Sequence, residues 1–133
     1  EVDALQGEPG VRSARFAQDA GYTPPKQASA TTDERNNLYL LERMTGVAHR
    51  TARYHCVLAL ARAGTVLATA DGAVEGEILT APRGHGGFGY DPLFYLPALS
   101  RTMAEISLEE KHTLSHRGRA FRALLPQLVT LQA

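Results

Sequence analysis

The sequence predicts an α/β fold in which a sheet is flanked by helices. Runs of alternating or continuous apolar residues, typical of strands, occupy the middle of the chain at residues 51–61, 65–70 and 74–79. Helix-capping residues followed by apolar residues at helical spacing lie on either side, after residue 31 and after residue 107. With 133 residues, the chain has the length of one domain.

The first helix is predicted from a capping-box pattern. Thr31 and Glu34 have the spacing at which a hydroxyl and a carboxylate cap each other's backbone N–H groups. Leucines at helical spacing follow, so we expect an amphipathic helix that packs against the core and runs to about Thr45. Gly46 is expected to stop it.

The strand pattern begins directly after this helix. The second half of residues 51–61 is apolar on both faces, which predicts a central position in the sheet. Residues 62–64 form a turn and residues 65–70 return as a second strand. The Asp71-Gly72 pair could form a bulge or a turn before residues 74–79 continue the sheet.

The C-terminal third contains a short strand at residues 93–96 and two helices. Ser107 and Glu110 form a second capping box, and Ser115 is a suitable N-cap for the last helix. Pro126 should kink or split that helix. Its buried stripe is expected to contain Ala120, Leu124, Leu128 and Leu131, widened by Phe121 and Leu125.

Composition excludes several classes of function. Lys and Arg number 14 and so do Asp and Glu, so no net charge favours nucleic acid or an anionic membrane. A single cysteine suits a reducing compartment, so we expect a cytoplasmic protein. No apolar run reaches the ~20 residues of a membrane-spanning helix. The chain opens with Glu1 and enters a turn at once, which suggests either a missing preceding segment or a trimmed domain.

A glycine-rich loop at residues 84–92 is the first candidate site. Its four glycines allow the backbone to approach a ligand closely. Phe88 lies between two of them and could stack on a base, an interaction worth roughly 1–3 kcal/mol. Asp91 precedes Pro92, which limits its freedom, and its carboxylate could accept hydrogen bonds from ring N–H groups. The alternative is a turn with Phe88 packed in the core.

Three hydrogen-bond donors form the second candidate site. Lys111 follows the Ser107 cap, whereas His116 and Arg117 follow the Ser115 cap. Backbone N–H groups at a helix start favour electron-rich ligand atoms, and all three side chains can donate. Such a donor set suits a carbonyl oxygen; the alternative is a solvated basic helix face. No acidic cluster suited to Mg²⁺ is evident.

With both stretches in view, the chain resembles the inosine triphosphate pyrophosphatase family, whose members hydrolyse non-standard purine nucleoside triphosphates. The base-binding motifs match in order and spacing. The matching segments are residues 1–5, 9–11, 13–16, 53–57, 87–92, 104–106, 110–111 and 115–118.

The resemblance implies a fold, a reaction and a set of site residues. The fold is a long curved mixed sheet between helical lobes, and the reaction converts a nucleoside triphosphate and water to the monophosphate and pyrophosphate with Mg²⁺. Many members are homodimers. The implied substrate-binding residues are Phe88, Gly89, Tyr90, Asp91, Lys111, His116 and Arg117. The ring would stack on the purine, Asp91 would accept from its N–H edge, and the three donors would address its 6-oxo group.

The family's phosphate-gripping and catalytic motifs have no counterpart in the sequence. These motifs, together with the Mg²⁺ ligands and the first strands, are expected upstream of Glu1, so we expect no catalytic residue within residues 1–133. The chain is then the C-terminal, base-binding portion of a single domain. Three possibilities remain open: part of a working enzyme, a truncated nucleotide-binding module, or a remnant that dimerises without hydrolase activity.

Overall fold

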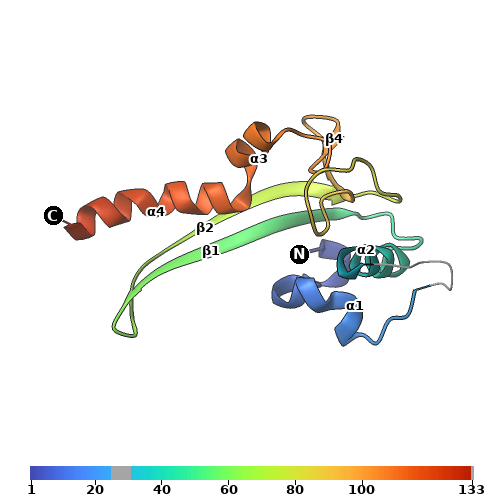
Figure 1. Cartoon of the computed structure of the whole chain (residues 1–133), viewed down its shortest axis with the longest axis horizontal. Coiled ribbons are helices and arrows are strands. Elements are labelled where there is room, and N and C mark those ends of the chain that lie inside the picture. Colours follow the sequence, from blue (N-terminus) through green and yellow to red (C-terminus); the bar gives the residue numbers. More distant parts are fainter. Residues whose placement is uncertain (25–30, 133) are drawn as a thin grey trace. The chain divides into compact units, whose positions relative to one another are not determined.

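The computed structural model describes residues 1–24 and 31–132, and the side chains up to residue 127. Its residues divide into two compact units, and Figure 1 labels their helices and strands. Unit 1 consists of Glu1–Ala52 and Gly76–Ile106, and unit 2 consists of Arg53–Glu75 and Ser107–Ala133.

The helices of unit 1 lie in its N-terminal segment. They are η1 (Asp3–Leu5), η2 (Gly10–Arg15), α1 (Phe16–Asp19) and α2 (Thr32–Arg43). The capping box of α2 is confirmed: the Glu34 N–H donates to Thr31 Oγ1 at 3.2 Å, and the Thr31 N–H donates to the Glu34 carboxylate at 2.9 Å. The helix ends at Arg43, two residues before the predicted end.

The buried face of α2 explains how this helix joins the core. Asn36, Leu40 and Met44 are buried and recur every four residues, so they share one face of the helix. Leu40 and Met44 are among the largest fully buried side chains of the described chain, together with Leu93 and Met103. This helix packs against α1 and η2, and Asn36 on its buried face accepts from the Ala17 N–H at 2.9 Å.

The strands of the described residues form one four-stranded sheet in the order β1-β2-β3-β4. Their bounds are β1 (Thr51–Arg62), β2 (Thr65–Ile78), β3 (Phe94–Leu96) and β4 (Arg101–Thr102). The pairs β2–β3 and β3–β4 are antiparallel, and a two-residue connection makes β1–β2 antiparallel as well. The helix-flanked α/β class is confirmed, whereas the parallel part of a mixed sheet stays a prediction.

The predicted central position of residues 51–61 is wrong for the sheet that the described residues form. There β1 is the first strand in the order and pairs with β2, apart from an isolated bridge between Val2 and Ala52. Alternate residues in its second half face solvent, and Val57 is 61% exposed. Apolar residues on both faces of a strand therefore do not guarantee burial on both faces.

No turn interrupts the second strand, which runs without a break from Thr65 to Ile78. Gly72 has a different role from the predicted bulge or turn. A Cβ at this position would lie 2.7 Å from Arg119 Cβ and closer still to the backbone of His116 and Ala120. The absence of a side chain at Gly72 lets the last helix lie directly on the strand.

The two helices of unit 2 begin at their predicted caps. They are α3 (Leu108–Leu114) and α4 (His116–Gln132). The Ser107–Glu110 capping box is present, and Ser115 Oγ accepts from the Gly118 N–H at 3.0 Å. Pro126 lies inside α4, so the predicted split is wrong.

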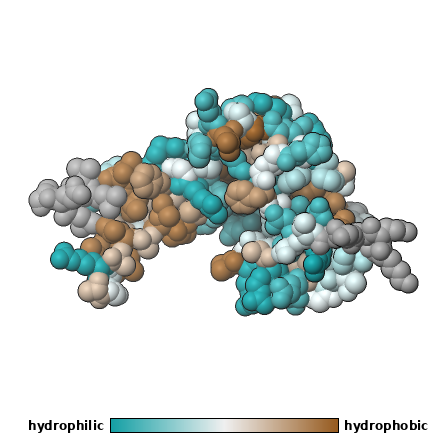
Figure 2. Space-filling view, viewed as in Figure 1, coloured by the Kyte–Doolittle hydropathy of each residue, from teal (hydrophilic) through white to brown (hydrophobic). Residues whose placement is uncertain are grey.

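Only part of the predicted stripe of α4 is confirmed. Ala120 and Leu124 are buried, whereas Phe121 and Leu125 are exposed, so the predicted widening of the stripe is wrong. Leu128 and Leu131 lie outside the described side chains. Hydrophobic surface gathers over α4 in Figure 2, consistent with these exposed side chains.

Candidate functional site

The glycine-rich loop of unit 1 presents an aromatic ring to solvent. Phe88 is 63% exposed, which excludes the alternative in which its ring packs in the core. Gly87 and Gly89, on either side of it, have φ values of 74° and 59°. Residues other than glycine rarely adopt this left-handed backbone conformation, so the two glycines allow the turn that exposes the ring.

The carboxylate of Asp91 lies beneath the same loop. It is only 4% exposed, and one of its oxygens accepts from the Phe88 N–H at 3.1 Å. The Asp91 N–H in turn donates to the Phe88 carbonyl at 3.2 Å. A side chain at Gly87 would collide with this carboxylate. Asp91 therefore fixes the backbone from which the ring projects, in addition to any contact with a ligand.

Three further side-chain hydrogen bonds tie the loop to the N-terminal helices of unit 1. The Gly89 N–H donates to Asp33 Oδ2 at 3.0 Å, and Asn37 Nδ2 donates to the Gly89 carbonyl at 3.0 Å. The Tyr90 hydroxyl donates to the Ser13 carbonyl at 2.6 Å. Burial, together with the Asp33 carboxylate, raises the pKa of Tyr90 well above its usual value, so the hydroxyl stays protonated as a donor.

Sequence reasoning did not find Asp33 and Asn37 as part of the site. Neither residue lies in the glycine-rich loop or among the three donors that the sequence singles out. Their partner Gly89 lies 56 and 52 residues away along the chain. No spacing rule relates residues so far apart, so the sequence contained no local signal for these contacts.

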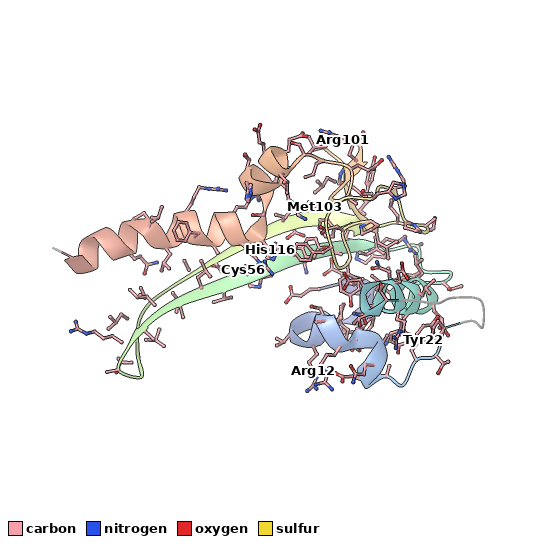
Figure 3. All side chains as sticks on the ribbon, in the orientation of Figure 1. Arg12, Tyr22, Cys56, Arg101, Met103 and His116 are labelled. Atoms are coloured by element: carbon pink, nitrogen blue, oxygen red, sulfur yellow. The ribbon has the colours of Figure 1, made fainter. Side chains whose placement is uncertain are left out.

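The three predicted donors lie in unit 2. Lys111 is a half-buried residue of α3, His116 is the half-buried first residue of α4, and Arg117 is exposed. The His116 ring stacks on Tyr54 of β1, with ring centroids 5.1 Å apart and planes inclined by 16°; Figure 3 labels His116 at the start of α4. Tyr54 thus orients the imidazole, a role that the strand pattern had not predicted.

The first turn of α4 packs against β2. Gly72 leaves room for its backbone, and Arg119 donates from Nη1 to the Ala73 carbonyl at 2.9 Å. Ser115 caps the same turn through the Gly118 N–H. The position of His116 and Arg117 therefore depends on a glycine, an arginine and a serine that need not touch a ligand.

The predicted site residues thus fall into two groups. Phe88, Gly89, Tyr90 and Asp91 belong to one loop of unit 1, and their backbone is fixed there. The three donors belong to unit 2. That both groups bind the same base stays a prediction.

The described residues include no large cluster of metal-binding side chains. Within residues 1–24 and 31–132, no group of three or more His, Cys, Asp or Glu side chains could hold a metal ion. No reaction step through a metal is therefore derived from these residues. The helices in the same ranges include none that is both long and apolar enough to cross a membrane.

Comparison with known proteins identifies the family. The model of the Ham1 family matches residues 1–127. A dITP/XTP pyrophosphatase from Acidobacterium capsulatum is 62% identical over 128 residues, which are 96% of this chain and 62% of that protein. One from Thermus thermophilus is 52% identical over 127 residues, 94% of this chain and 56% of that protein.

Solved structures show the same fold. The structure of the Staphylococcus aureus Ham1 protein matches with a TM-score of 0.82 at 37% identity, over 100% of this chain and 64% of that chain. A HAM1 protein from Coxiella burnetii matches with a TM-score of 0.80 at 38% identity, over 97% and 62%. The chain therefore spans somewhat less than two thirds of these relatives, and the family resemblance seen in the sequence is confirmed.

Proposed function

Because the chain belongs to the Ham1 family, we propose that it is the base-recognition portion of an enzyme that hydrolyses non-standard purine nucleoside triphosphates. The products are the nucleoside monophosphate and pyrophosphate, and the substrates are ITP, dITP and XTP. Relatives that carry the name dITP/XTP pyrophosphatase support this substrate class. Residues 1–133 form the C-terminal part of a single domain in this proposal.

The observation that carries the proposal is the exposed ring of Phe88 on a loop whose backbone is hydrogen-bonded on both sides. A large aromatic side chain normally gains free energy from burial. A solvent-exposed ring on a fixed backbone is suited to stacking on a flat heterocycle such as a purine.

The donor set explains the choice of base. Lys111, His116 and Arg117 are proposed to donate to the 6-oxo group of hypoxanthine or xanthine, while Asp91 accepts from the N–H edge. Adenine has an amino group at position 6, which would leave the donors that the bound base covers without an acceptor. Sites that hydrogen-bond a substrate group can discriminate by up to about 10⁴–10⁵-fold against an analogue that lacks it.

The remaining assignments also belong to the proposal. Mg²⁺ is the proposed cofactor and would balance the charge of the triphosphate. The proposed protein is a cytoplasmic homodimer that binds neither nucleic acid nor membrane. The equal numbers of acidic and basic residues support the absence of a nucleic-acid partner.

The test is pyrophosphate release from ITP, with Mg²⁺, by the protein of the complete open reading frame that encodes this chain. We expect activity on ITP and XTP and little on ATP. Lys111→Ala or His116→Ala should raise the KM for ITP strongly while changing the melting temperature little. Unchanged kinetics in these variants, or equal activity on ATP, would refute the proposal. The same assay on residues 1–133 alone separates an active portion from a binding module.

A further inference from the structure

Two side chains of α2 hold the polar backbone groups of one loop residue. Asp33 and Asn37 lie four positions apart, so they project from the same face of the helix. Asp33 accepts from the N–H of Gly89 and Asn37 donates to its carbonyl, each at 3.0 Å. Both polar groups of Gly89 are therefore bound by one helix.

Gly89 is the residue directly after Phe88, which carries the exposed ring. The Phe88 N–H is bound by Asp91, and the Phe88 carbonyl accepts from the Asp91 N–H. With Gly89 bound on the other side, the backbone of the ring-bearing residue is fixed at both of its peptide groups. Gly89 is itself in the left-handed region, where its φ of 59° needs no strain because it lacks a side chain.

The chemistry of Asn37 shows that this contact is specific. The Gly89 carbonyl can only accept, so the Asn37 amide nitrogen must face it. The amide oxygen is then buried without a hydrogen-bond partner among the residues that the structure describes. A buried unpaired oxygen is unfavourable, and an apolar residue would avoid it. The hydrogen bond from the Asn37 amide nitrogen to the Gly89 carbonyl helps to offset this cost.

We propose that Asp33 and Asn37 are positioning residues for base recognition: by clamping Gly89 to α2, they hold Phe88 in the orientation that stacks on the purine. This inference rests on the proposed function. A preorganised ring binds without first ordering its loop, which favours tighter binding. The clamp residues act through the loop and need not touch the nucleotide.

The test uses inosine monophosphate as the probe and the protein of the complete open reading frame. Asn37→Asp has the same shape but places a carboxylate oxygen against the Gly89 carbonyl, so repulsion replaces the hydrogen bond. Asp33→Ala removes the acceptor, whereas Asp33→Asn keeps an oxygen that can accept. Glu42→Gln, an exposed change on the same helix, is the control.

Two quantities are measured for each variant: the dissociation constant for inosine monophosphate and the hydrogen-exchange rate of the Gly89 amide. Asn37→Asp and Asp33→Ala should weaken binding about 10-fold or more, since small misplacements of a binding group are costly. Both should also accelerate exchange at Gly89. Asp33→Asn and Glu42→Gln should stay near the unmodified protein. If Asp33→Asn weakens binding as much as Asp33→Ala, the helix charge and not the clamp is responsible, and the inference is overturned.

Phe88→Ala separates this inference from the function on which it rests. If Phe88→Ala weakens binding but Asn37→Asp and Asp33→Ala change neither quantity, the clamp is refuted and the proposed function stands. If Phe88→Ala leaves the dissociation constant unchanged, the stacking role fails and the clamp's role in base recognition fails with it.

Discussion

Replacing Gly72 by alanine should displace the first turn of α4, where two of the proposed donors lie. The added Cβ would lie 2.7 Å from Arg119 Cβ and closer still to two backbone atoms of the helix. Ordinary contact begins near 3.4 Å, so restoring it requires a shift of roughly 0.7 Å at Arg119 Cβ (3.4 minus 2.7) and a larger shift at the two backbone atoms. Backbone cannot rotate away as a long side chain can, and overpacking of this kind typically costs about 1–3 kcal/mol.

The assay for this prediction is calorimetric titration of inosine monophosphate at a temperature where the variant is still folded. Because a displacement near 1 Å can cost up to about 100-fold, we expect Gly72→Ala to weaken binding by about 10-fold or more. Amide chemical shifts in the first turn of α4 should change in the absence of ligand.

Gly64→Ala is the matched control for Gly72→Ala. Gly64 lies in the turn of the same hairpin with a φ of 81°, and an added Cβ there would meet no atom within 4 Å. Alanine in this left-handed conformation costs roughly 1–2 kcal/mol, so stability should fall by a similar amount without any push on α4. Equal dissociation constants for the two variants would refute the role of Gly72.

Three further predictions concern side chains that support the same framework. Tyr54→Ala removes the ring stacked on His116 and should weaken inosine monophosphate binding by the equivalent of about 0.5–1.5 kcal/mol, whereas titration of Tyr54→Phe should give the original affinity. The hydrogen bond from the Thr102 N–H, and to a smaller extent the charge of Arg83, lower the pKa of Glu105 below its usual value. The ionised Glu105 carboxylate therefore stabilises the folded protein fully above the usual pKa, and this contribution is lost as the pH falls through the lowered pKa. The melting-temperature difference between Glu105→Gln and the unmodified protein should accordingly shrink in acid, and a constant difference would contradict the assignment. Arg50 donates to four backbone carbonyls, so Arg50→Lys, with at most three donors, should lower the free energy of unfolding in urea by roughly 1–3 kcal/mol.

The features that the sequence predicted well are determined within a few residues. The caps at Thr31, Ser107 and Ser115 are all present, because each depends on a side chain and an N–H group three residues apart. The β1–β2 turn is equally local, since Gly64 supplies the left-handed conformation that the hairpin needs. For Phe88 the sequence left two alternatives open, an exposed ring or a ring packed in the core, and the structure shows the exposed one.

The features that the sequence did not predict depend on distant partners. Whether Val57 or Phe121 is buried depends on what covers the strand or helix, and nothing in a hydrophobic pattern specifies that. Gly72 looked like a turn residue because glycine serves both turns and close approaches. The Asn37–Gly89 contact links two segments 52 residues apart, so only the folded chain shows it.

We propose that one purine contacts both the ring of Phe88 and the donor set of Lys111, His116 and Arg117. Intermolecular nuclear Overhauser effects from H2 and H8 of bound inosine monophosphate test it directly. We expect cross-peaks from the same nucleotide to the Phe88 ring and to the Lys111 or His116 side chain. Cross-peaks to only one of these groups, or to neither, would contradict it.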